Sequence, residues 1–335
     1  MSLPRVSVLS LGGTISSVKS GGPGVRPALT GEALVESVPA LSEVAEVSAA
    51  SLRQVPGWGL TLEDLVEVAA EANRRVEGGA AGVVVTQGTD SIEETAFALD
   101  LLVQGDGPVV VTGAMRNPTL PGADGPANLL AAVRVAASGA ARGIGAVVVM
   151  NDEIHAARHV RKTHTQSPAA FRSVGAGPIG WVSEGSVRIP LRPADRQHVG
   201  PPDGRASHEV ALVGVWPGDD GRILGAVGDL GYDGLVVEGM GGGHVPTAAV
   251  GPLEGLAARM PVVIASRTGG GETLARTYDA PGSEMDLLAR GLIPAGPLDG
   301  PKARILLALL LRSGASREEI HAAFGHRPEG MNAET

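Results

Sequence analysis

Short runs of apolar, mostly β-branched residues recur along the chain, and segments of helical character lie between them. Continuous apolar runs of this length are typical of strands in a parallel sheet that is covered on both faces. Strands that alternate with helices predict an α/β fold. The predicted strands are Val6 to Leu11, Gly82 to Thr86, Pro108 to Thr112, Ala146 to Met150, Ala211 to Val215, Gly234 to Val237 and Pro261 to Ala265.

Two of the intervening segments carry helix signals. The segment Thr61 to Val76 opens with a capping-box-like pattern, in which Asp64 follows Thr61 by three residues, and two glycines end it. The segment Ser91 to Leu102 has two glutamates in its first turn, where they interact favourably with the helix dipole. We therefore expect a helix over each segment.

The length and composition allow two domains of ordinary size, because the chain has 335 residues and 43% of them are apolar. Residues 191–208 are polar and rich in proline, glycine and arginine, which is typical of a linker. We predict a larger N-terminal domain over residues 1–190 and a smaller C-terminal domain over residues 209–335.

The charge and the cysteine count restrict the partners and the chemistry. A net charge of −9 argues against a general nucleic-acid or anionic-membrane surface, so a small molecule is the expected partner. The chain has no cysteine, which excludes disulfides, thiolate metal sites and a cysteine nucleophile.

The N-terminal sequence predicts a cytoplasmic location. The apolar run Val6 to Leu11 is too short for the core of a signal peptide, and no small-residue cleavage site follows it. No stretch approaches the roughly 18 uncharged apolar residues that span a bilayer.

Two glycine turns with hydroxyl residues follow predicted strands. Gly12 and Gly13 precede Thr14, and Gly88 precedes Thr89 and Asp90. Both turns would lie at the carboxyl edge of the sheet, where ligands bind in open α/β folds, and their backbone N–H groups could hold an oxyanion. Each turn taken alone is also compatible with an ordinary helix N-cap.

These motifs resemble those of the bacterial-type L-asparaginase family. The resemblance runs in order over nearly the whole chain and includes Gly12-Gly13-Thr14-Ile15, Gly88-Thr89-Asp90, Thr112-Gly113-Ala114-Met115-Arg116, Ala123-Asp124-Gly125-Pro126-Ala127-Asn128-Leu129, Val149-Met150-Asn151-Asp152, Lys162-Thr163 and Pro301-Lys302-Ala303-Arg304. It implies a larger domain with a mixed, mostly parallel sheet and a smaller domain with a flavodoxin-like parallel sheet. It also implies hydrolysis of L-asparagine to L-aspartate and ammonia without a metal or organic cofactor, with glutamine as a second substrate.

By the same resemblance, Thr14 is the nucleophile, and Thr89, Asp90 and Lys162 form the group that activates a hydroxyl. A threonine hydroxyl is a weak nucleophile, and a lysine can act as its base if desolvation lowers the lysine pKa. The alternative is that Lys162, which lies in a basic stretch, is a solvated surface charge.

The resemblance also assigns substrate contacts. Asp90, next to Gly88 and Thr89, would hold the α-amino group, and Ala114 would offer its carbonyl to the departing ammonia. Glu284 would reach the amine from a neighbouring subunit, in a homotetramer built from intimate dimers. Glu284 is equally compatible with a first-turn acid of a helix.

The chain departs from the family in the loop after Thr14. Many relatives carry a tyrosine there, but Ser16 to Leu29 contains none. Three alternatives remain: another group activates Thr14 (Ser17, Lys19 or a water held by Glu284), catalysis is slower, or Tyr278 approaches from elsewhere in the assembly. The Gly/Ser-rich residues 16–24 could form a lid over the substrate or an ordinary disordered loop.

A second departure concerns the substrate carboxylate. Relatives usually supply a Ser-Gln pair where this chain has Gly57, Trp58 and Gly59. Backbone N–H groups of this segment would have to take its place. Trp58 would either narrow the pocket towards small substrates or serve only in packing.

Three other functions compete with this interpretation. A zinc site is suggested by His155 and His159 on one predicted helical face, with Asp152, Glu153 and His164 nearby, but the glutamate of a His-Glu-x-x-His helix is missing. A nucleotide site is suggested by the glycine-rich residues 238–244, which lack the third glycine of the motif. The third is a non-catalytic asparagine sensor, since a fold does not fix a function.

Overall fold

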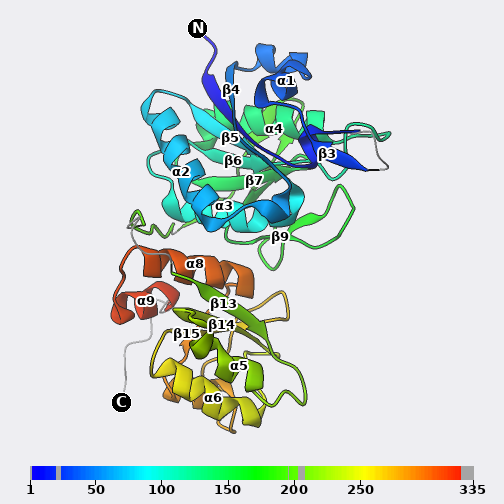
Figure 1. Cartoon of the computed structure of the whole chain (residues 1–335). Helices are drawn as coiled ribbons and strands as arrows, with labels where there is room; N and C mark the ends of the chain where they lie inside the picture. The colour runs from blue at the N-terminus through cyan, green and yellow to red at the C-terminus, as the bar shows by residue number, and fades with distance from the viewer. Residues whose placement is uncertain (1, 20–23, 195, 203–207, 326–335) are drawn as a thin grey trace. The chain divides into compact units, whose positions relative to one another are not determined.

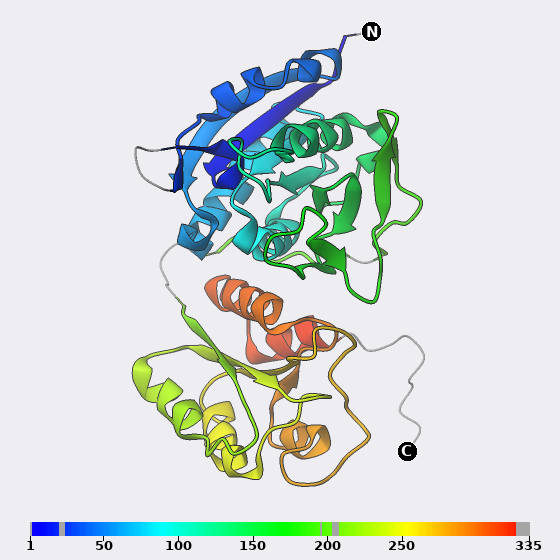
Figure 2. The ribbon, with the colours of Figure 1, turned by 90° about the vertical axis from the view of Figure 1, so that its right-hand side faces the viewer.

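The computed structural model describes residues 2–19, 24–194, 196–202 and 208–325, with only the backbone of Lys19. The chain forms two compact units, residues 1–198 and 199–335, and the division falls inside the predicted linker (Figures 1 and 2). Among the described residues, no helix is both long enough and apolar enough to cross a membrane.

The N-terminal unit is built on an eight-stranded sheet with the order β12-β11-β8-β7-β6-β5-β1-β4. The five strands from β4 to β7 are parallel neighbours, and β8, β11 and β12 extend the sheet in antiparallel fashion. This confirms the mixed, mostly parallel sheet. The strands are β1 (Arg5–Gly12), β4 (Glu46–Val55), β5 (Gly82–Thr86), β6 (Val109–Thr112), β7 (Ala146–Met150), β8 (Glu153–Ala156), β11 (Gly180–Ser183) and β12 (Ser186–Arg188).

Helices cover both faces of this sheet, with α1 and α4 on one side and α2 and α3 on the other (Figure 1). The predicted capping box is present, because the Thr61 hydroxyl accepts the Asp64 N–H and the Asp64 carboxylate accepts the Thr61 N–H. The helices are α1 (Gly31–Glu36), α2 (Leu62–Glu77), α3 (Ile92–Leu102) and α4 (Gly125–Ala137), with 3₁₀ turns at Thr14–Ser16, Pro39–Glu43, Gly57–Gly59, Thr89–Ser91 and Gly139–Ala141.

The sequence prediction missed an edge strand and strands that belong to hairpins. β4 lies at the sheet edge and mixes exposed with half-buried positions, so it has no continuous apolar run. β8 follows β7 through a two-residue turn at Asn151 and Asp152, whose φ angles of 52° and 61° are those of a tight hairpin. Two small hairpins complete the unit, namely β2 (Ser17–Lys19) with β3 (Val25–Pro27) and β9 (Val160–Lys162) with β10 (Phe171–Ser173).

The C-terminal unit contains a four-stranded parallel sheet with the order β13-β14-β15-β16. Helices α5 and α6 lie on one side of it and α8 and α9 on the other (Figure 1). The predicted smaller domain with a parallel sheet is confirmed. The elements are β13 (Val210–Gly214), α5 (Arg222–Ala226), β14 (Gly234–Gly239), α6 (Thr247–Ala257), β15 (Val262–Ser266), α7 (Glu284–Ala289), β16 (Ile293–Pro294), α8 (Gly300–Arg312) and α9 (Arg317–Phe324), with a 3₁₀ turn at Val227–Leu230.

Candidate active site

Three glycine backbones meet at the carboxyl edge of the N-terminal sheet. A Cβ atom added to Gly13 would lie 2.0 Å from the amide nitrogen of Gly88, and one added to Gly88 would lie 2.5 Å from the amide nitrogen of Gly57. Gly13 also has a φ of 83°, which favours glycine. The turns that carry Thr14, Trp58 and the Thr89 segment can approach this closely only because no side chain separates them.

Thr14 opens the first of these turns and is partly buried. Within the described parts of the chain, its hydroxyl makes no hydrogen bond with another residue. The hydroxyl of Ser17 donates to the Gly13 carbonyl at 2.9 Å. The side chain of Lys19, another suggested activator, and residues 20–23 of the suggested lid lie outside the described residues.

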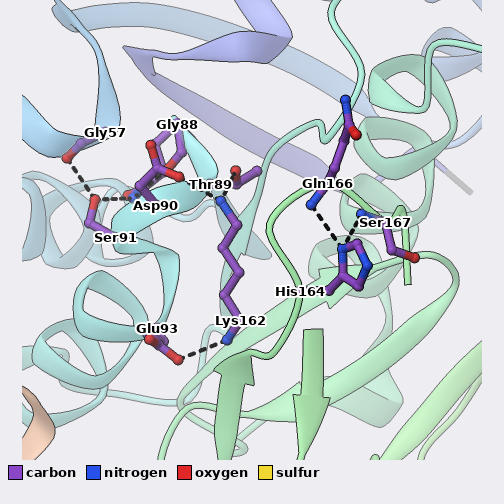
Figure 3. Close-up of polar contacts among 11 residues, drawn as sticks. Gly57, Gly88, Thr89, Asp90, Ser91, Glu93, Lys162, His164, Gln166 and Ser167 are labelled. Carbon is purple, nitrogen blue, oxygen red and sulfur yellow. Dashed lines mark hydrogen bonds and ion pairs between the residues drawn. The ribbon is translucent and has the colours of Figure 1, made fainter. Parts of the chain in front are cut away.

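Lys162 reaches the second turn from β9 (Figure 3). Its Nζ lies 2.9 Å from the Thr89 hydroxyl oxygen and 2.5 Å from a carboxylate oxygen of Asp90. The lysine side chain is 14% exposed and that of Asp90 is 49% exposed. The alternative of a solvated surface lysine is therefore wrong, and the structure brings Thr89, Asp90 and Lys162 together.

Ser91 and Glu93 hold this arrangement, although the sequence indicated only that they begin a helix (Figure 3). Ser91 donates its hydroxyl to the Gly57 carbonyl at 2.8 Å, and Gln87 donates to the Ser91 oxygen at 3.2 Å. Glu93 accepts the backbone N–H of Lys162 at 2.8 Å. Their partners lie far away in the sequence, so local spacing could not reveal these contacts.

Trp58 lies between Gly57 and Gly59 in a 3₁₀ turn, and its side chain points mostly into solvent, with 79% of its surface exposed in the single chain. It does not pack into the core of its own unit. A role in narrowing the pocket stays a prediction.

Glu284 lies in the C-terminal unit, at the start of α7, and is buried. Its carboxylate accepts the N–H groups of Thr277 and Tyr278, both at 2.7 Å, and lies 2.9 Å from Nε2 of His244. Burial alone would raise the pKa of Glu284, but the backbone N–H groups of Tyr278 and Thr277 hold that pKa below its ordinary value. Its contact with a neighbouring subunit's site stays a prediction, as does an activating role for Tyr278.

The zinc interpretation assumed a helix that is absent. His155 belongs to β8 and His159 to the turn after it, so the two residues do not share a helical face. His155 is buried, and its Nδ1 lies 3.0 Å from the Ser173 hydroxyl. Burial, with a smaller contribution from the nearby charge of Arg172, lowers the pKa of His155 to about 4. No group of three potential metal ligands occurs among the described residues.

The glycine-rich turn after β14 is closed on itself. The N–H groups of Gly243 and His244 both donate to the Met240 carbonyl, and the Met240 N–H donates to the His244 carbonyl. These three N–H groups are therefore used within the turn itself and do not point at a bound phosphate.

The fold is α/β with two domains, and the site groups Thr89, Asp90 and a partly buried Lys162, with Thr14 on the adjacent turn of the same sheet edge. Residues 5–195 match the family model of the asparaginase N-terminal domain, and residues 209–324 match that of the glutaminase/asparaginase C-terminal domain. The chain belongs to the asparaginase family and is an amidohydrolase of that family.

Individual relatives match over most of their length. L-asparaginase 2 of Escherichia coli (strain K12) is 36% identical over 343 residues, covering 97% of this chain and 93% of that protein. A glutamyl-tRNA(Gln) amidotransferase subunit from Methanosarcina mazei is 32% identical over 319 residues, covering 89% of this chain and 70% of that protein. The crystal structure of a probable cytoplasmic L-asparaginase from Campylobacter jejuni has a TM-score of 0.86 and 29% identity, and the match covers 96% of this chain and 99% of that one.

Proposed function

We propose that the chain hydrolyses L-asparagine to L-aspartate and ammonia through an ester on Thr14. The observation that carries this proposal is the position of Lys162, whose Nζ contacts both Thr89 and Asp90 from within a mostly buried environment. A weak threonine nucleophile needs a base, and Lys162, held against the Thr89 hydroxyl, is in position to act as one.

The reaction has two halves. In the first, Thr14 Oγ bonds to the side-chain amide carbon, the C–N bond breaks, and the hydroxyl proton leaves with the nitrogen as ammonia. In the second, a water adds to the ester, the bond to Thr14 Oγ breaks, and aspartate leaves while Thr14 regains a proton. In each half, Thr89 takes the proton of the attacking hydroxyl or water while uncharged Lys162 accepts the Thr89 proton, and these protons then pass back along the same path to the leaving group.

The substrate contacts follow from the same residues. Asp90 holds the α-amino group, and backbone N–H groups of residues 57–59 hold the α-carboxylate, in a turn that Ser91 anchors through the Gly57 carbonyl. Gly88 and Thr89 contact the substrate from the second turn, and the Ala114 carbonyl accepts a hydrogen bond from the departing ammonia.

Glu284 is proposed to complete the site from a neighbouring subunit of a homotetramer built from intimate dimers. A carboxylate that stays ionised and is held rigidly by two backbone N–H groups is suited to an ammonium group. We also propose a cytoplasmic location, which the description of the Campylobacter jejuni relative supports.

Ammonia release from purified protein tests the proposal, with L-asparagine, L-glutamine and D-asparagine as separate substrates. We expect release from L-asparagine and slower release from L-glutamine. Release from glutamine alone would replace asparagine as the substrate. Asparagine binding without release from any amide would support the asparagine sensor instead.

A further inference from the structure

Asp124 directs its side chain away from the helix that it precedes. It occupies the N-cap position of α4, yet its carboxylate makes no capping hydrogen bond to that helix. An N-cap aspartate normally accepts an N–H group of the first helical turn. Here one carboxylate oxygen accepts the N–H of Met115 at 3.0 Å and the other accepts the N–H of Arg116 at 2.8 Å.

Asn128 fixes the other side of the same loop. Its amide nitrogen donates to the Gly113 carbonyl at 3.0 Å and to Asp124 at 3.1 Å, and its oxygen accepts the N–H of Asn151 at 3.0 Å. The Asn128 side chain is buried, and its bond to the Gly113 carbonyl is buried as well. Asn128 thereby ties the loop after β6 to the turn between β7 and β8.

These bonds determine where the Ala114 carbonyl points. The carbonyl of Ala114 and the N–H of Met115 belong to one planar peptide group and point in opposite directions. Because Asp124 holds the Met115 N–H, it also sets the direction of the Ala114 carbonyl. Ala114 is fully buried, and its carbonyl accepts no hydrogen bond from any residue that the structure describes. A buried carbonyl without a donor retains its acceptor capacity for a ligand.

The loop lies next to the nucleophile turn. A Cβ atom added to Gly125 would lie 2.9 Å from Cγ1 of Ile15, the neighbour of Thr14, and 3.4 Å from Cβ of Ala114. The first residue of α4 therefore brings these two segments together.

We propose that Asp124 and Asn128 are positioning residues that aim the Ala114 carbonyl at the departing ammonia. This inference rests on the proposed function and adds two residues to it, neither of which touches the substrate. Their effect should be largest in the step in which the amide nitrogen leaves, because that nitrogen carries N–H groups of its own that can donate to the carbonyl.

The test compares kcat/KM for L-asparagine with kcat/KM for L-aspartate β-methyl ester, in which an ester replaces the side-chain amide. Both substrates form the same acyl group, but the leaving oxygen of the ester carries no hydrogen of its own before proton transfer, whereas the amide nitrogen carries two. In Asp124→Asn the side chain keeps only one acceptor oxygen. The N–H of either Met115 or Arg116 then faces an amide NH₂ and loses its hydrogen bond. We expect the amide-to-ester ratio to fall about 10- to 100-fold, since small misplacements of a catalytic group have costs of this size.

The ester reaction of the same preparation reports whether the site is assembled. Asn128→Leu, of similar size, provides a second variant and should lower the ratio in the same direction. Glu319→Gln is the matched control, because Glu319 also accepts a backbone N–H, that of Ser316 at 2.7 Å, but lies in the C-terminal unit. Its ratio should equal that of the wild type.

Equal losses on both substrates, an unchanged ratio, or loss of both reactions through failure to fold would overturn the positioning role. A wild-type chain that hydrolyses neither substrate would instead count against the proposed function.

Discussion

The Nζ atom of Lys162 lies 2.9 Å from the Thr89 hydroxyl, although the two residues are 73 positions apart in the sequence. Replacing the lysine should therefore remove proton transfer without dismantling the site. The Asp90 carboxylate would lose its ion pair with Lys162, but it is about half exposed, so water can solvate it in the variant. We expect Lys162→Met to lower kcat for asparagine about 100- to 10,000-fold, as loss of a general base does, with little change in the thermal midpoint.

The neighbouring cation Arg161 provides the control for Lys162→Met. Arg161→Met changes the charge by the same amount on the same strand and should retain most of the activity. Steady-state kinetics and thermal unfolding of both variants measure the difference, and a Lys162→Met enzyme of near wild-type kcat would rule out this lysine as the base.

The contact between Gly13 and Gly88 leaves no room for a methyl group. Gly13→Ala would combine a left-handed φ with a clash against the Gly88 backbone, so we expect a loss of about 2 to 4 kcal/mol in the free energy of unfolding and loss of most activity. Gly24→Ala is the control, because nothing lies within 4 Å of a Cβ atom there. Urea unfolding should separate the two variants, and similar stabilities would contradict the close packing of the turns.

Burial of His155 should make the folded protein less stable in mild acid. Its pKa is about 4 in the folded protein, against the ordinary histidine value of 6.5 that applies to the unfolded chain. The unfolded state therefore binds the proton first as the pH falls, and stability decreases between pH 6.5 and about 4. The shift corresponds to roughly 3 kcal/mol.

His155→Gln should weaken this pH dependence, measured as the urea midpoint at several pH values. His321→Gln, at an exposed histidine, should leave it unchanged. The same slope in the wild type and in His155→Gln would show that another group is responsible.

Sharing of the site between subunits can be tested by mixing two inactive variants. Thr14→Ala and Glu284→Gln should each be nearly inactive, but a mixed dimer has one site with an intact Thr14 and an intact Glu284. After random exchange of subunits, activity should return to about a quarter of the wild-type value, since half of the dimers are mixed and half of their sites are intact. The control is each variant taken alone through the same exchange. No recovery in the mixture would place Glu284 in the site of its own chain, and an active Glu284→Gln would place it outside the site.

The sequence predicted the central strands and the two glycine turns because both depend on local signals. An apolar run such as Val83 to Val85 is buried at every position, and Gly13 is required by its own φ and by its close contact. The edge strand β4 lacks such a run, which is why it was missed.

The supporting contacts of the site could not be predicted from spacing. Ser91 with Gly57, Glu93 with Lys162 and Asn128 with Asn151 join segments that are far apart in the sequence, and only the folded sheet brings those segments together. The grouping of Lys162 with Thr89 followed from the family resemblance, because the basic stretch around the lysine favoured a surface position.

The central claim is that Thr14 carries the acyl group. It is tested most directly by quenching the enzyme in acid during turnover of L-asparagine and identifying the modified residue by peptide mass spectrometry. The account predicts one aspartyl group in ester linkage on Thr14, absent from Thr14→Ala. An aspartyl ester on Thr89 or another hydroxyl, or a Thr14→Ala enzyme that still releases ammonia, would contradict it.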